Sequence, residues 1–298
     1  MKYDFDKIID RSGSGDLKHE VLKARYGRDD LIALWVADMD FETPSFILDA
    51  IKNRLQHPIV GYTVEPSEYW PTVSRWIADH HGWNVKTEWL TYVPGVVKGI
   101  GMAINALTQP GDRILIQTPV YHPFRMTIEG NDRQVVLNPL KESSEGSFYQ
   151  MDFDSLEQSL KGCKMMVLCN PHNPGGIQWS KPILERVAQI CHKHKVIVIS
   201  DEIHADLALF GHKHIPFATV SKEAEEISIT FQAPTKTFNM AGIAEHTLCR
   251  SLLQGAHSGH KVHTSRVVIP RMARLPSVRS QPRRPSGPLC QQSPIGAQ

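Results

Sequence analysis

One lysine, Lys236, stands among small, hydroxyl and turn-forming residues in the segment 233–243 (APTKTFNMAGI). The residues just before it, 227–232 (ISITFQ), alternate in hydrophobicity, so Lys236 is predicted to lie at the end of a buried strand. A lysine amine that is partly removed from water has a lowered pKa, which lets it attack a carbonyl group and act as a base near neutral pH. The competing interpretation is a solvated lysine in a turn.

Small and polar residues also follow other strand-like segments. They are residues 95–97 (GVV), 118–121 (TPVY), 170–175 (NPHNPG) and 201–204 (DEIH). Ligands of a parallel α/β sheet bind beyond the carboxyl ends of its strands. These residues are therefore predicted to form one site with Lys236, although they lie far apart in the sequence.

Apolar strands alternate with helices along most of the chain, which predicts an α/β fold with a mainly parallel sheet sandwiched by helices. The predicted strands are residues 89–95, 113–119, 133–140, 163–171, 196–202 and 227–232. The predicted helices are residues 45–55, 72–82, 96–110 and 181–195. The predicted organisation is an N-terminal arm (1–45), a large domain (46–244) and a tail (245–298).

The charge of the chain is divided unevenly. The 298 residues carry a net charge of +2, but residues 247–298 hold eight Lys or Arg and no Asp or Glu. This composition predicts a disordered basic tail. The tail lacks aromatic residues that could stack on bases, which argues against nucleic acid as a partner.

Composition also excludes several classes of protein. No apolar run could cross a bilayer and no signal peptide is evident, so no membrane partner is predicted. The five cysteines are sparse and irregular, which predicts a reduced cytoplasmic protein. No cluster of His and Cys has zinc-like spacing, so no metal is predicted.

Six motifs in order resemble one family. Three of them, residues 170–176 (NPHNPGG), 200–207 (SDEIHADL) and 236–242 (KTFNMAG), resemble the fold-type I pyridoxal-phosphate enzymes of the aminotransferase class. The other three point to the cystathionine β-lyase branch, whose members are C–S lyases; they are residues 9–18 (IDRSGSGDLK), 34–41 (LWVADMDF) and 61–63 (GYT).

The resemblance implies pyridoxal 5'-phosphate as the cofactor and gives roles to matching residues. Lys236 would bind the cofactor covalently and then remove the substrate's α-proton. Asp201 would pair with the ring nitrogen, and the alternative for this residue is the cap of a following helix. Tyr121 would stack on the ring, while Asn173 and His204 would hydrogen-bond its phenolic oxygen.

The cofactor phosphate would be held by other residues. The backbone N–H groups of Val96 and Val97 would bind it at a helix N-terminus, and Thr235 would add a hydroxyl. Tyr62 would reach the phosphate of a neighbouring subunit, which implies a homodimer. Ala233 and Ala244 stand where aminotransferases often have a serine and an arginine, so fewer phosphate contacts are expected.

The implied activity is a C–S β-lyase that acts on small amino-acid thioethers such as cystathionine or other cysteine S-conjugates. The alternatives are an aminotransferase, a non-catalytic regulatory protein and an inactive truncated product. No part of the sequence after Ile243 resembles the family, which suggests a change of reading frame. The family's C-terminal small domain is therefore predicted to be missing, with weak or no turnover.

Overall fold

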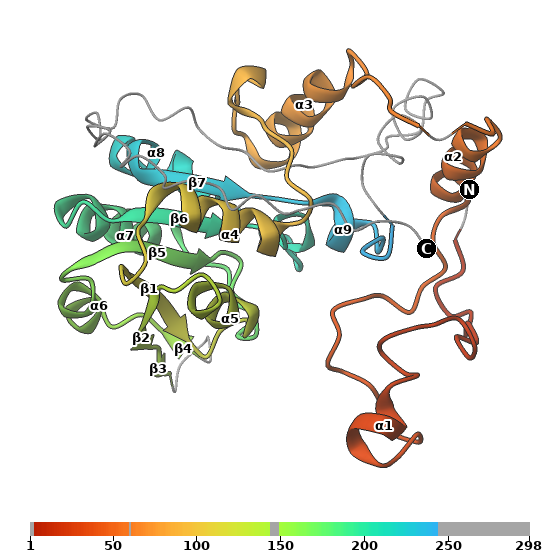
Figure 1. The fold of residues 1–298 in the computed structure, drawn as a ribbon, viewed down its shortest axis with the longest axis horizontal. Helices are drawn as coiled ribbons and strands as arrows, with labels where there is room; N and C mark the ends of the chain where they lie inside the picture. The colour runs from red at the N-terminus through yellow and green to blue at the C-terminus, as the bar shows by residue number, and fades with distance from the viewer. Residues whose placement is uncertain (1–2, 60, 144–148, 244–298) are drawn as a thin grey trace, which may run out of the picture.

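The computed structural model describes residues 3–59, 61–143 and 149–243, and its centre is a five-stranded parallel sheet (Figure 1). The strand order is β2-β1-β5-β6-β7, and every neighbouring pair is parallel. The strands are β1 (Arg113–Thr118), β2 (Gln134–Pro139), β5 (Cys163–Cys169), β6 (Ile197–Asp201) and β7 (Ser228–Phe231). These strands, and the α/β architecture, confirm the prediction.

Helices cover both faces of the sheet because successive strand side chains point to opposite sides. Ile114 and Ile116 pack with α4 and α5 on one face, whereas Leu115 packs with α6, α7 and α8 on the other. The covering helices are α4 (Val96–Leu107), α5 (Pro123–Glu129), α6 (Phe153–Ser159), α7 (Lys181–Lys193) and α8 (Lys222–Ile227). Burial on both faces explains why these strands read as continuous apolar runs.

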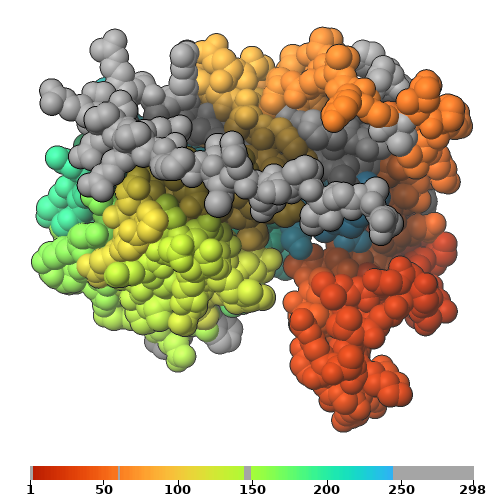
Figure 2. All heavy atoms as spheres, in the orientation of Figure 1, coloured from red at the N-terminus to blue at the C-terminus, as the bar shows by residue number. Residues whose placement is uncertain are grey.

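The N-terminal residues form an arm that extends from the body of the protein (Figure 1), and Figure 2 shows the arm protruding. Its hydrophobic side chains at Ile8, Ile32 and Leu34 are almost fully exposed. Two short helices lie along this part of the chain and a third packs above the sheet: α1 (Leu22–Tyr26), α2 (Ser45–Leu55) and α3 (Tyr69–His81).

The remaining elements are short. They are the 3-10 helices η1 (Thr87–Trp89), η2 (Ala205–Leu207) and η3 (Phe217–Thr219), the two-stranded sheet of β3 (Lys141–Glu142) and β4 (Tyr149–Gln150), and the single turn α9 (Pro234–Thr237). None of the helices in the described ranges is long and apolar enough to cross a membrane.

The structure corrects three predicted boundaries. Residues 89–95 do not form a strand: η1 ends at Trp89 and only Leu90 makes a one-residue bridge. Helix α3 begins at Tyr69, before Pro71. Proline is tolerated in the first turn of a helix, because an N–H group at that position would have no intrahelical acceptor. Helix α4 ends at Leu107, where the Thr108 hydroxyl donates to the Ile104 carbonyl at 2.6 Å.

The predicted basic tail (245–298) lies outside the described residues, as does the chain that would show whether a small domain follows the sheet.

Replacing Gly99 with alanine is expected to destabilise the domain. Its Cβ would lie 2.5 Å from Phe231 Cε1 and 2.7 Å from Val93 Cγ2, so α4 could no longer approach β7 closely. Overpacking costs about 1–3 kcal/mol and the gain in helix propensity returns about 1 kcal/mol, which leaves a net loss of up to about 2 kcal/mol. Urea unfolding of G99A measures it.

The matched control lies one half-turn further along α4. A Cβ at Gly101 would meet Thr127 Cγ2 at 3.4 Å, an ordinary contact, so G101A should be neutral or slightly stabilising. Equal stability of G99A and G101A would contradict the packing explanation.

Candidate active site

The carboxyl ends of three adjacent strands are joined by backbone hydrogen bonds. The Asn170 N–H after β5 donates to the Asp201 carbonyl at 2.9 Å, and the Glu202 N–H after β6 donates to the Phe231 carbonyl at 2.8 Å. The residues that end β5, β6 and β7 therefore lie side by side, as the parallel arrangement predicts.

Asp201 is a buried carboxylate at the end of β6, with only 4% of the residue exposed. Burial raises its pKa to about 7, and the charge of Glu202 adds to the effect, while the Ile203 N–H and the Lys236 charge work against it. The Ile203 N–H donates to Asp201 Oδ1 at 3.1 Å. The side chain thus caps the following turn, which was the alternative interpretation, and still faces Lys236.

The end of β6 is fixed by the neighbouring carboxylate, Glu202. This fully buried side chain accepts from the Ser200 hydroxyl and the Phe217 N–H, each at 2.8 Å, and lies 2.8 Å from His214 Nε2. With the Gln232 amide, which donates to Oε2 at 3.3 Å, these partners can satisfy the four oxygen lone pairs of the carboxylate without solvent. Glu202 therefore holds the strand end that carries Asp201.

Lys236 lies in α9, five residues beyond the end of β7, and is partly buried. Burial lowers the pKa of its amine, and the negative charges of Asp38 and Asp201 oppose this. The amine donates to the carbonyl of Ala37 in the N-terminal arm at 3.0 Å. A lysine with a lowered pKa near a buried carboxylate has the properties of a nucleophilic amine.

His204 and Tyr121 lie within electrostatic reach of this pair. Burial lowers the pKa of His204, and the positive charge of Lys236 lowers it further. Burial raises the pKa of the Tyr121 phenol, as does the negative charge of Asp201. The Tyr121 N–H donates to the Asn173 carbonyl at 3.1 Å, which joins the two loops.

The loop after β5 is held beside Asp201 by a buried thiol. The Asn173 N–H donates to Cys169 Sγ at 3.2 Å, and Cys169 pairs in register with Asp201. Burial and the charge of Asp201 raise the pKa of this thiol far above its ordinary value, so it remains protonated. Cys169 thus anchors the loop and is not a nucleophile.

The predicted phosphate ligands occupy the start of α4. Gly95 precedes the helix with φ +102°, a conformation that favours glycine, and a Cβ built there would meet no atom of the described residues within 4 Å. The next residues, Val96 and Val97, begin the helix, so their N–H groups lack intrahelical acceptors. Thr235 lies beside Lys236 in α9 and is partly buried. No hydrogen bond among the described residues links Thr235 to the start of α4.

Tyr62 stands apart from the other predicted residues. Its side chain is fully exposed, and no hydrogen bond or ring contact joins it to the part of the chain that is described.

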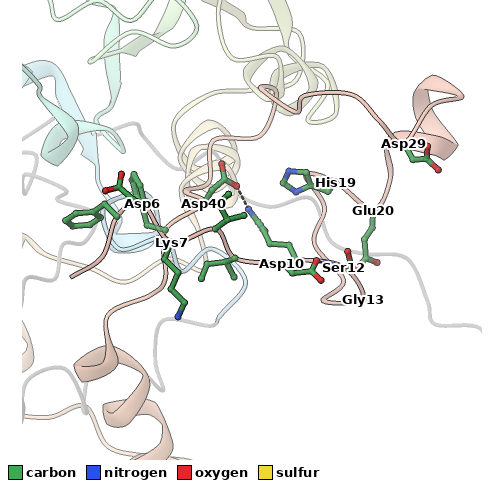
Figure 3. Close-up of a pocket in the computed structure, with 14 residues that line it drawn as sticks. Asp6, Lys7, Asp10, Ser12, Gly13, His19, Glu20, Asp29 and Asp40 are labelled. Atoms are coloured by element: carbon green, nitrogen blue, oxygen red, sulfur yellow. Dashed lines mark hydrogen bonds and ion pairs between the residues drawn. The ribbon is translucent and has the colours of Figure 1, made fainter. Parts of the chain in front are cut away.

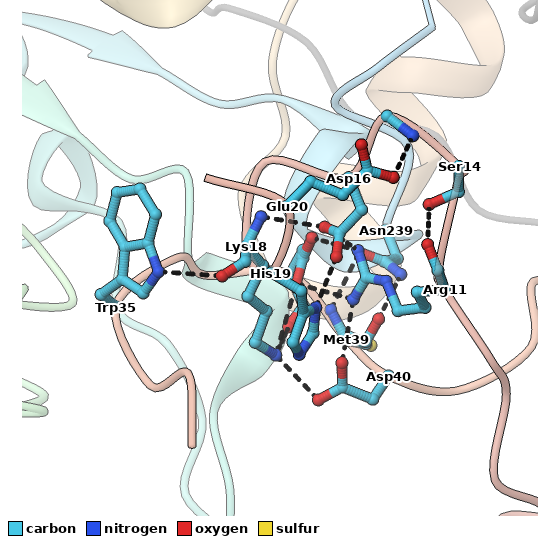
Figure 4. Close-up of polar contacts among 12 residues, drawn as sticks. Arg11, Ser14, Asp16, Lys18, His19, Glu20, Trp35, Met39, Asp40 and Asn239 are labelled. Atoms are coloured by element: carbon cyan, nitrogen blue, oxygen red, sulfur yellow. Dashed lines mark hydrogen bonds and ion pairs between the residues drawn. The ribbon is translucent and has the colours of Figure 1, made fainter. Parts of the chain in front are cut away.

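The N-terminal arm crosses the segment 234–240 that carries Lys236, here called the lysine turn, a contact that the sequence did not predict (Figure 4). Asn239 clamps the backbone of Met39: its side-chain oxygen accepts from the Met39 N–H at 3.0 Å, and its amide donates to the Met39 carbonyl at 2.9 Å. The neighbouring Asp38 pairs with Arg11 at 2.8 Å. Asp38 is thereby held close enough to Lys236 to raise its pKa.

Substituting Asn239 with glycine is expected to release the arm locally. Asn239 has φ +51°, which glycine adopts without strain, so N239G removes two hydrogen bonds and little else. Each bond contributes about 0.5–1.5 kcal/mol, so opening should become easier by about 1–3 kcal/mol. Hydrogen exchange at Met39 measures this, with peptides from β5 as the internal control. Unchanged exchange at Met39 would contradict the clamp.

A separate hollow lies within the arm (Figure 3). It has a volume of about 910 Å³ and is lined by arm residues that include Lys7, Arg11, His19 and Glu20. None of the residues predicted from the sequence for the site lines it.

The buried carboxylate fits the cofactor that the resemblance implies. In the described part of the chain, the Asp201 side chain accepts one hydrogen bond, from the Ile203 N–H, and its burial disfavours the charged form. A cationic ring nitrogen would supply the missing opposite charge. Among the residues that the structure describes, the open space at Gly95 and the N–H groups of the next two residues, which lack intrahelical acceptors, fit a phosphate.

Comparisons with known proteins agree with this geometry. The family model described as aminotransferase class I and II matches residues 29–259. Cystathionine beta-lyase PatB of Bacillus subtilis (strain 168) is 44% identical over 241 residues, which are 80% of this chain and 62% of that protein. The chain thus spans less than two thirds of this relative.

Two solved structures have the same fold. A PLP-bound putative aminotransferase from Clostridium difficile 630 aligns with a TM-score of 0.78 and 42% identity, over 88% of this chain and 70% of that one. Cystalysin from Treponema denticola, whose structure contains pyridoxal 5'-phosphate, aligns with a TM-score of 0.76 and 33% identity, over 90% and 70%. Sequence motifs, fold and the family match together place the chain in the aminotransferase class I and II family.

Proposed function

We propose that this chain carries the cofactor-binding part of a pyridoxal-phosphate-dependent C–S β-lyase. The observation that supports this most directly is the position of Lys236, in the turn after β7, within electrostatic reach of the buried Asp201 at the end of β6, where each charge affects the pKa of the other side chain. Bound pyridoxal phosphate supplies an electron sink for negative charge that develops at the substrate's α-carbon.

The protein's own residues have separate tasks in this proposal. Asp201 keeps a proton on the ring nitrogen by offering a negative charge in a buried place. Lys236 holds the cofactor and then moves a proton at the substrate's α-carbon, for which a lowered pKa is suited. Tyr121 covers the ring, and Asn173 and His204 hydrogen-bond its oxygen.

The phosphate would rest on Val96, Val97 and Thr235. The exposed side chain of Tyr62 would reach the phosphate of a second subunit, so the proposed assembly is a homodimer. These assignments follow the family motifs, and the open N-terminus of α4 supports the phosphate position.

Cystathionine or another cysteine S-conjugate is the proposed substrate, in line with the similarity to PatB. Proton removal at the α-carbon and departure of the β-thiolate give a thiol and an enamine, which hydrolyses to pyruvate and ammonia. An aminotransferase would use the same cofactor residues but would transfer the amino group to a keto acid.

The test is product analysis with the purified chain, pyridoxal phosphate and L-cystathionine. Thiol, pyruvate and ammonia in equal amounts, formed without a keto acid, are expected. Amino transfer that requires a keto acid, with no pyruvate released, would overturn the lyase assignment. Binding of pyridoxal phosphate without a visible absorbance band would overturn the assignment of the lysine.

A further inference from the structure

The carboxylate of Asp206 joins α3 to the lysine turn. Its Oδ2 accepts from the Thr237 hydroxyl at 2.8 Å, and its Oδ1 accepts from Trp76 Nε1 at 3.1 Å. His81 Nε2 lies 2.9 Å from the same Oδ1. Trp76 and His81 belong to α3, while Thr237 is the residue after Lys236.

This junction is closed to water. The side chains of His81 and Asp206 are 3% and 7% exposed, and Trp76 is buried. Burial works to raise the pKa of Asp206, but His81 and the Thr237 hydroxyl outweigh it, so the pKa is lowered. Asp206 therefore stays ionised, and hydrogen bonds to a charged acceptor are stronger than neutral ones.

The N-terminal arm holds the lysine turn through the Asn239–Met39 clamp and the bond from Lys236 to the Ala37 carbonyl, and Met240 packs against Ile47. Helix α9 is a single turn of four residues, and a helix this short is not stable through its own backbone bonds. Backbone bonds from Phe238 to Pro234 and from Met240 to Thr235 close the turn, but both lie within the same segment. The Thr237–Asp206 bond ties the turn to η2, and the contacts of Asp206 with Trp76 and His81 extend the link to α3, about 160 residues earlier in the chain.

We propose that Asp206 is a positioning residue, which through Thr237 fixes the turn that presents Lys236 to the site. The role of Lys236 rests on the proposed function, but the mechanical link is a property of the described structure. Asp206 itself touches neither the amine nor the proposed cofactor position. Loss of the link should let the lysine side chain move out toward water.

The test compares Thr237→Val with Thr237→Ser. Valine keeps the shape of threonine and removes the hydroxyl, whereas serine keeps the hydroxyl. The readout is the pH dependence of acylation of Lys236 by acetic anhydride, followed by mass spectrometry on protein without cofactor. T237V should shift the midpoint upward, toward the ordinary lysine value of about 10.4, because the amine becomes better hydrated. T237S should retain the wild-type midpoint.

A double-mutant comparison tests whether Asp206 acts through Thr237. The shift in D206N/T237V should equal that of the larger single variant and not the sum of D206N and T237V, because both remove one link. D79N is the matched control: Asp79 is exposed on α3, and its substitution should leave the midpoint unchanged.

Two results would overturn the proposal: a wild-type midpoint in T237V, or fully additive shifts in the double variant. T237V keeps the proposal testable if D206N fails to fold. Because the labelling needs no cofactor, it reports on positioning even if product analysis rejects the lyase. Absence of a visible absorbance band in the wild type would count against the proposed function alone.

Discussion

Asp201→Asn is expected to stabilise the cofactor-free protein above pH 7 while weakening its binding of pyridoxal phosphate. Burial raises the pKa of Asp201 from 3.8 to about 7 in the folded chain. Between these values the unfolded chain loses the proton and the folded chain keeps it, so stability falls as the pH rises. Three units of pKa correspond to about 4 kcal/mol, an upper bound on the loss above pH 7.

Asparagine resembles the protonated acid and carries no charge at any pH. The stability difference between D201N and wild type should therefore grow from pH 5 to pH 8 and then level off. Urea unfolding at a series of pH values measures it, with the exposed Asp79→Asn as the control that should show no such growth. A difference that does not change with pH would contradict the raised pKa.

The same substitution should lower cofactor affinity. Asp201 offers its charge to the ring nitrogen in a buried place, and removal of one partner of a buried pair costs about 3–5 kcal/mol. We expect affinity to fall on the order of 10²-fold or more, measured by fluorescence titration with pyridoxal phosphate. If D201N raises the stability of the cofactor-free protein and lowers its affinity for pyridoxal phosphate, Asp201 is a functional residue that destabilises the fold.

Lys236→Ala is expected to abolish the visible absorbance band that forms on titration with pyridoxal phosphate. Alanine has no amine to bind the cofactor's carbonyl group, and proton removal at the substrate loses its base. General-base catalysis contributes about 10²–10⁴-fold, so any lyase activity should fall at least that far. Absorbance spectra and pyruvate release measure the two effects separately.

Lys98→Ala is the matched control for this substitution. Lys98 is exposed on the first turn of α4, close in sequence to the proposed phosphate ligands, yet it carries no assigned role. K98A should retain the band. The same band in K236A and wild type would mean that another amine reacts with pyridoxal phosphate, and the assignment of Lys236 would be wrong.

Much of the fold could be predicted because periodicity is a local property. The runs 163–171 and 196–202 contain uninterrupted apolar stretches, at 165–169 and 196–199, and they include β5 and β6, which are covered on both faces. The strand predicted at 89–95 does not form, because strand pairing, unlike periodicity, is not a local property. Its β-favouring composition does not ensure pairing, and a strand needs a neighbour in the right register.

In the candidate site too, residues in local motifs could be predicted, whereas contacts between distant segments could not. Lys236, Asp201 and Asn173 could be named because they stand at the ends of apolar strands, inside recognisable motifs. The carbonyl of Ala37 and the Asn239–Met39 clamp could not, since they join segments about 200 residues apart through backbone atoms. The Asp206–Thr237 bond was equally hidden, because neither residue shows any pattern that names its partner.

The uniformly parallel sheet has a consequence for how the protein folds. Each parallel pair must be joined by a crossover, so native contacts connect residues distant in sequence, and such topologies fold slowly. Asp201 ends β6 and Lys236 lies in the turn after β7, the last strand of the described sheet. These two residues can therefore come close together only after most of the strands are aligned. The proposed cofactor therefore selects molecules that have already folded, by mass action on the native state, and does not template their folding.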